Sequence, residues 1–132
     1  MDRTLIKNYT AAATVTVRRC VKFDATTPNP NVQPAAAATD AIVGISTMVG
    51  DSGGATVAAG NRVDVVLNGV TEAEAGASFA AGVLLSSDAS GRVITAAASA
   101  GSNVRVVGVA LQPAGAAGDI VQVSVQPASF QG

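Results

Sequence analysis

The acidic residues are the first place to look for chemistry, because two carboxylates held close together can act as general acid and base. Glu72 and Glu74 are the closest such pair in the 132-residue chain. In an extended segment they share one face, and we expect no basic partner beside them. The pattern therefore favours a solvated edge over a catalytic dyad. The other carboxylates are spread singly: Asp2, Asp24, Asp40, Asp51, Asp64, Asp88 and Asp119.

Candidate nucleophiles are equally isolated. Cys20 lies in the run Arg18-Arg19-Cys20-Val21-Lys22, where neighbouring cations could lower its pKa and make it reactive. A small residue filling a strand position is the favoured alternative. The segment Gly50-Asp51-Ser52-Gly53-Gly54 resembles the surroundings of a serine-protease nucleophile, but the chain has no His to act as the base. We interpret that segment as a turn, and we expect no catalytic residues.

Binding motifs for metals and phosphates are also missing from the sequence. There is no Cys-x-x-Cys, no His-based ligand set and no Lys after a glycine pair, as a P-loop requires. Arg18, Arg19 and Lys22 form the one basic cluster; it could meet an acidic partner or a phosphate backbone, or be an ordinary exposed strand face. With a net charge of −1, the chain has no basic field for nucleic acid. We expect no metal, no cofactor and no direct nucleic-acid contact.

Composition indicates a protein that is stabilised by assembly. Apolar residues make up 48% of the chain, charged residues 13% and aromatic residues 3%. The core must therefore be built from Val, Ile, Leu and Ala, which bury a modest area in each copy, and oligomerisation is one remedy for a thin core. Without a signal-like N-terminus or a run of membrane-spanning length, we expect synthesis in a cytoplasm and no membrane contact.

Alternating apolar and polar residues predict strands along most of the chain. The strongest pattern is 62–67, and the Asn68-Gly69 pair after it predicts a tight turn that ends the strand. Thr71 and Glu74 resemble a helix capping box, but Gly76 breaks the run, so a short helix there is the less favoured alternative. Residues 13–18 and 19–23 are predicted to form one or two strands. Further strands are predicted at 41–46, 80–87, 92–96, 104–110 and 120–125, with a hairpin turn at 88–91.

The chain contains an internal echo. Residues 42–46, with Gly44 at the centre, match residues 106–110, with Gly108 at the centre. Residues 62–67 match residues 120–125. Chance recurrence in a Val- and Gly-rich chain is the alternative. The sequence predicts an all-β fold, a small barrel or sandwich of two duplicated strand-turn-strand units with little or no helix. We expect an extended N-terminal arm at 1–12, one β domain at 13–126 with a proline-rich loop at 24–40, and a C-terminal tail at 127–132.

The second half of the chain resembles the capsid cement or head decoration proteins of tailed bacteriophages. The motifs that carry the resemblance occur in one order: Leu67-Asn68-Gly69-Val70, Gly76-Ala77-Ser78-Phe79-Ala80-Ala81-Gly82, Ser87-Asp88-Ala89-Ser90-Gly91-Arg92, Val107-Gly108-Val109-Ala110 and Gly118-Asp119-Ile120-Val121-Gln122-Val123. Each is a turn or strand signature, so their order and spacing carry the specificity. The first forty residues have no comparable signature.

The resemblance implies a non-enzymatic virion protein on the outer surface of the capsid. It would be made in the bacterial host cytoplasm, bind the major capsid protein at junctions between capsomers, and assemble as a homotrimer. The alternatives are another phage β protein, such as a head fibre or tail-tube subunit, and a surface- or carbohydrate-binding β module. The scarcity of aromatic residues argues against the last of these, because sugar platforms usually stack on Trp or Tyr. A hydrolase is the most distant alternative.

Overall fold

The computed structural model describes residues 4–24, 31–47, 56–97 and 103–131. Within these ranges every regular element is a β-strand, which confirms the expected all-β class, and no helix is long and apolar enough to cross a membrane. The strands are β1 (Leu5–Thr10), β2 (Val15–Thr16), β3 (Cys20–Asp24), β4 (Asn31–Pro34), β5 (Ile42–Thr47), β6 (Thr56–Val57), β7 (Arg62–Glu74), β8 (Leu84–Ser87), β9 (Val93–Thr95), β10 (Asn103–Ala110) and β11 (Ile120–Gln131).

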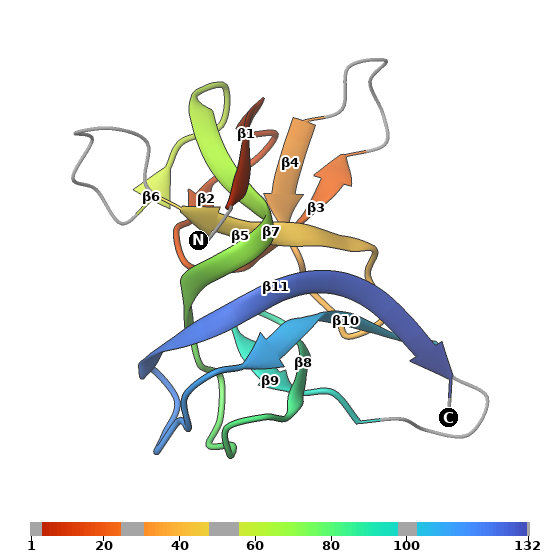
Figure 1. The fold of residues 1–132 in the computed structure, drawn as a ribbon. Helices are drawn as coiled ribbons and strands as arrows, with labels where there is room; N and C mark the ends of the chain where they lie inside the picture. Colours follow the sequence, from red (N-terminus) through yellow and green to blue (C-terminus); the bar gives the residue numbers. More distant parts are fainter. Residues whose placement is uncertain (1–3, 25–30, 48–55, 98–102, 132) are drawn as a thin grey trace.

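One curled sheet forms most of the molecule. Its strand order is β4-β3-β5-β7-β11-β10-β8-β9, and β1 also pairs with β7. The 13-residue strand β7 joins the two halves of the molecule (Figure 1). Its first half pairs with β1 and β5, and its second half, from Gly69, pairs with β11. A small sheet of β2 and β6 lies beside it.

The same strand arrangement repeats outward on both sides of the β7–β11 pair, which agrees with the duplication expected from the sequence. Reading outward, β7-β5-β3-β4 in one half corresponds to β11-β10-β8-β9 in the other, and each neighbouring pair is antiparallel. Gly44 and Gly108 have the same function in the two units. A Cβ at Gly44 would collide with the Val66 carbonyl oxygen, and one at Gly108 with the Ser124 carbonyl oxygen.

Two apolar clusters form the core. The smaller cluster contains Ala11, Val15, Val21, Val32, Val57, Val63 and Val65. The larger one gathers residues of both halves, among them Cys20, Ile45, Val66, Leu85, Val107, Val121, Val123 and Val125. Because neighbouring residues such as Cys20 and Val21 belong to different clusters, the β3–β5 part of the sheet is buried on both faces.

The prediction of a tight turn at Asn68-Gly69 is wrong, because β7 continues through these two residues to Glu74. Gly69 does adopt a positive φ of 118°, as the sequence suggested, but it bends the strand instead of reversing it. A Cβ there would lie 2.8 Å from the Thr4 Cα, so the bend brings the first described residue against β7. Thr71 and Glu74 are likewise in the strand and cap no helix.

The structure also departs from three expected boundaries. Residues 5–10 of the expected arm form β1, which pairs along β7. The proline-rich segment 24–40 contains β4, whose Pro34 is tolerated because β4 is an edge strand. Residues 127–131 of the expected tail continue β11 against β10. Backbone hydrogen bonds stabilise these segments without the apolar alternation on which the strand predictions depended.

Candidate interaction surface

The turn between β2 and β3 organises the main polar cluster of the described residues. Arg18 adopts a φ of 64°, which is uncommon for a residue other than glycine. Its backbone N–H donates to the Ser46 carbonyl at 2.8 Å, and its own carbonyl accepts from Glu74 N–H at 2.8 Å. The buried Ser46 hydroxyl donates to the Thr16 carbonyl at 2.8 Å. The turn is therefore fastened to both β5 and β7.

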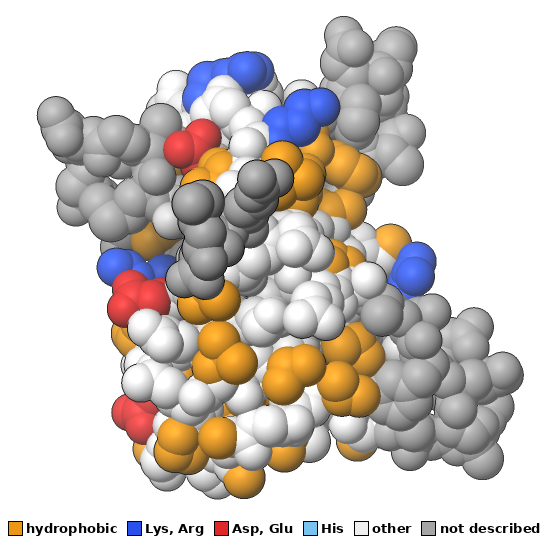
Figure 2. Space-filling model, viewed as in Figure 1, with side chains coloured by type: hydrophobic (Ala, Val, Ile, Leu, Met, Phe, Trp, Pro, Cys, Tyr) orange, Lys and Arg blue, Asp and Glu red, His pale blue; other side chains and the backbone are white. Residues whose placement is uncertain are grey.

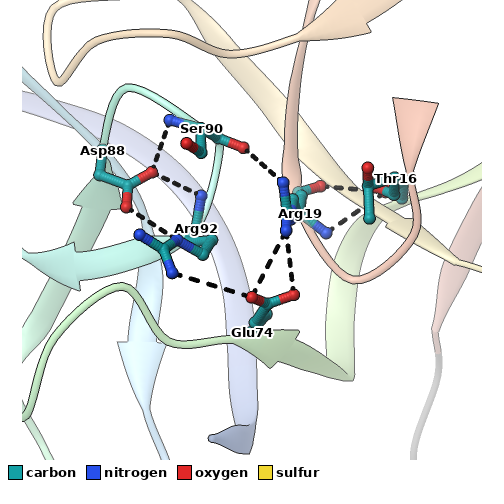
Figure 3. Close-up of polar contacts among 7 residues, drawn as sticks. Thr16, Arg19, Glu74, Asp88, Ser90 and Arg92 are labelled. Atoms are coloured by element: carbon teal, nitrogen blue, oxygen red, sulfur yellow. Dashed lines mark hydrogen bonds and ion pairs between the residues drawn. The ribbon is translucent and has the colours of Figure 1, made fainter. Parts of the chain in front are cut away.

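An ion-pair network connects this turn to the β8–β9 hairpin (Figure 3). Arg19 contacts Glu74 at 3.3 Å and the Ser90 carbonyl at 3.3 Å. Arg92 lies 4.0 Å from Glu74 and 3.2 Å from Asp88. Asp88 also accepts the backbone N–H groups of Ser90 and Arg92 at 2.8 Å and 2.9 Å. The network thus links the two sheet halves and fixes the predicted hairpin turn.

The expectation that Glu72 and Glu74 have no basic partner is wrong. Arg18 contacts Glu72 at 3.4 Å, and Glu74 contacts both Arg19 and Arg92. The folded chain brings residues more than 50 positions apart into contact, which sequence spacing does not reveal. Glu74 therefore has a structural environment, because both of its oxygens are engaged by arginines.

The predicted basic cluster is dispersed in the structure. Besides the arginine pairs, Lys22 contacts Asp40 at 3.0 Å. Burial alone would raise the pKa of Asp40, but hydrogen bonds from the Ala36 N–H and Lys22 outweigh it and hold the pKa below the usual value. Arg18, Arg19 and Lys22 are each matched with a carboxylate, so they form no free cationic patch for a phosphate backbone.

Cys20 lies in the larger core cluster and is fully buried. Desolvation, assisted by the negative charge of Asp88, raises the pKa of its thiol from 9.0 to about 12. Arg18 and Arg19, its neighbours in the sequence, do not lower this pKa and so do not activate a thiolate. Its environment is that of the small strand residue favoured by the sequence, with the thiol protonated at neutral pH.

The segment 50–54, with Asp51 and Ser52, lies outside the described residues. Within the described ranges no group of three or more His, Cys, Asp or Glu side chains is arranged to hold a metal ion.

A hollow of about 340 Å³ opens beside Arg18. It is lined by Arg18, Thr47, Val70, Thr71, Glu72 and Gln122. The lining offers a paired cation and anion, two hydroxyl groups and an amide around one apolar side chain. These groups can hydrogen-bond a polar side chain of a protein partner.

An apolar outer face continues from this hollow across four strands. In register, Val70 of β7 lies opposite Ser124 of β11, Ser124 opposite Val109 of β10, and Val109 opposite Leu84 of β8. We call this set, Val70, Ser124, Val109 and Leu84, the outer row. Val70 and Leu84 are 41% and 45% exposed, and Leu111 and Ile120 add exposed apolar area nearby. Figure 2 shows the surface over β10 and β11 as almost entirely apolar or uncharged, with acidic side chains at its left margin.

These features define a class: a small all-β protein with a neutral, apolar sheet face suited to protein contacts. Most of the charged side chains described above form ion pairs within the subunit. The chain belongs to the phage cement protein family, which it matches over residues 2–125. This membership confirms the resemblance found in the sequence and identifies a structural protein of phage virions. No curated protein sequence matches the chain.

The structure is also similar to that of the head fiber gp8.5 N base in bacteriophage phi29. The two share 15% sequence identity with a TM-score of 0.65, over 94% of this chain and 95% of that chain. At this identity the likeness concerns the fold: the curled β architecture described above also occurs in that head fiber protein.

Proposed function

We propose that the protein is a homotrimeric cement that binds the outer surface of the capsid, contacts the major capsid protein at junctions between capsomers, and stabilises the shell without catalysis. Membership of the phage cement protein family carries this proposal. The neutral apolar outer face supports it, because this is the kind of surface that subunits bury against one another. In this proposal the protein is made in the cytoplasm of the bacterial host and is localised on the virion.

Stabilisation follows from repetition. Each contact with the shell need only be modest, because three linked subunits bind as one unit and the lattice repeats the contact many times. The start of β1 offers one means of attachment: Leu5 and Ile6 are 59% and 48% exposed on a strand paired only with β7 among the described strands. Such an edge can accept an added strand from a shell subunit.

The experiment is a binding assay with expanded capsids that lack the cement protein. Purified protein should co-sediment with these capsids, saturate at a fixed ratio to the capsid subunit, and raise the temperature at which the particles release DNA. Unexpanded precursor shells serve as the matched control, because capsomer junctions differ before expansion. Failure to bind expanded capsids at micromolar protein concentrations would refute the proposal.

The fold likeness to a head fiber base favours one second candidate, the base of a longer surface fibre. Electron microscopy of saturated capsids distinguishes the two. A cement protein covers junctions throughout the lattice, whereas a fibre base projects from selected positions and carries a further domain or a partner fibre.

A further inference from the structure

The two duplicated units correspond residue by residue across their strand pairs. In the first unit, Cys20 pairs with Ile45 and Ile45 with Val66. In the second unit, Leu84 pairs with Val109 and Val109 with Ser124. The two rows are equivalent because the neighbouring pair also corresponds. Gly44 pairs with Val21 in the first unit, and Gly108 pairs with Leu85 in the second.

The equivalent rows differ in what covers them. Cys20, Ile45 and Val66 are 0%, 0% and 2% exposed, because the second unit packs on them in the larger core. The second row is less covered: Leu84 is 45% exposed, and Val109 and Ser124 are partly exposed, with the Gln126 amide donating to the Ser124 hydroxyl at 2.9 Å. One row of a duplicated pair is thus core, and its counterpart, extended by Val70, lies at the surface and is partly exposed.

We propose that the outer row and its apolar surroundings are the surface on which other copies of this chain pack, with three such faces turned toward a common three-fold axis. The inference rests on the proposed homotrimer and assigns its contact surface. Within the chain, the equivalent row is already covered by a β unit of this same sequence, so a unit from another copy is a cover of suitable size and chemistry.

The charge on this face favours identical partners. The carboxylates at its margin, Glu72 and Glu74, are neutralised within the subunit by Arg18, Arg19 and Arg92. Copies brought together around an axis would therefore place neutral surfaces in contact, without the like-charge repulsion that identical charged faces incur. A closed ring of such contacts leaves no bare face to recruit further copies.

The area is sufficient for a specific contact. Four strands spaced about 4.8 Å apart, along about eight residues of β11, cover roughly 19 by 27 Å, or about 500 Å² per copy. Three such faces meeting at one axis then bury about 1,500 Å² in total, compared with about 1,000 Å² for the smallest biological interfaces. The hollow beside Arg18 opens at one end of the same face, since Val70, Glu72 and Gln122 line it.

The test is the oligomeric mass of charged variants. Leu84→Lys and Val109→Lys should lower the association constant more than about tenfold in sedimentation equilibrium, because each would bury an unpaired ammonium group. Ile6→Lys, at an equally exposed apolar residue away from this face, should leave the mass unchanged. An unchanged mass for both face variants would overturn the proposal, as would a monomeric wild-type protein.

Thiol labelling provides a second measurement that leaves the apolar face uncharged. Because Cys20 is fully buried, Leu84→Cys and Ile6→Cys each introduce one accessible thiol. Labelling at residue 84 should slow as the protein concentration rises through the association range, whereas labelling at residue 6 should not. Equal rates at all concentrations would overturn the inference even if the lysine variants failed to fold.

Capsid binding separates this inference from the proposed function. If the lysine variants are monomers and the wild-type trimer fails to bind capsids, the interface stands and the cement function falls. If the variants keep the wild-type mass but no longer bind capsids, the face contacts the shell, and the inference falls while the cement function stands.

Discussion

Replacing Gly108 by Ala tests the close approach of β10 to β11 in the second half of the sheet. An added Cβ would collide with the Ser124 carbonyl oxygen and lie 2.9 Å from the carbonyl carbon and 3.1 Å from the Val125 Cα. All of these are backbone atoms in a paired strand, so no side chain can rotate away. Overpacking costs about 1–3 kcal/mol, and each ladder hydrogen bond stretched beyond use costs about 1 kcal/mol. We expect Gly108→Ala to lower the free energy of unfolding by about 3 kcal/mol.

Gly44→Ala should behave in the same way, because a Cβ there would collide with the Val66 carbonyl oxygen. Gly82→Ala is the matched control: Gly82 has a φ of 89° but no atom within 4 Å of an added Cβ, so only backbone strain of about 1–2 kcal/mol applies. Urea unfolding at one fixed protein concentration measures all three, since oligomers unfold in a concentration-dependent way. A loss at Gly108 no larger than that at Gly82 would refute the close-approach argument.

Three further predictions concern titratable groups. Because burial raises the pKa of Cys20 to about 12, its thiol should not react with a disulfide reagent at pH 8 in the native protein and should react fully in denaturant. The stability of the protein should decline above pH 9, because there the thiol of the unfolded chain ionises before that of the folded chain. Asp88→Ala removes the acceptor of the Ser90 and Arg92 N–H groups and should cost about 1–3 kcal/mol in urea unfolding, whereas Asp88→Asn keeps an acceptor oxygen and should cost less; equal losses would contradict the turn's dependence on these bonds. Since the pKa of Asp40 is lowered on folding, its contribution to stability is present above pH 3.8 and lost as the pH falls further, so Asp40→Asn should flatten the acid side of the stability profile.

Sequence periodicity was enough to predict the all-β class, the central glycines and the duplicated units. It succeeded there because alternation reports which face of a strand is buried. The continuation of β11 was missed because Gln126 and Pro127 break the alternation. In the structure these two residues fall where the β10–β11 register shifts, so Pro127 lies at a bulge, where a missing N–H is tolerated.

The polar network could not be predicted for a different reason. Arg19 and Glu74 are 55 residues apart, and only the fastening of the β2–β3 turn to β7 brings them together. The unusual φ of Arg18 leaves no mark in the sequence, since positive φ is normally signalled by Gly or Asn. The wrong expectation for Glu72 and Glu74 followed from considering β7 alone, without the turn that packs beside it.

The distribution of charge explains how one sparsely charged chain can be both a stable fold and an assembling surface. The described charged side chains are used mainly between segments of the subunit: Arg18 with Glu72, Arg19 with Glu74, and Lys22 with Asp40. These pairs fix the turns and bends that the thin Val and Ala core does not. Because these charges are matched nearby, their field is weak at the apolar face, and that face can approach a neutral partner without desolvating them unpaired. The same ion pairs that fix the β2–β3 turn against β7 therefore leave the β8–β10–β11 face available for assembly.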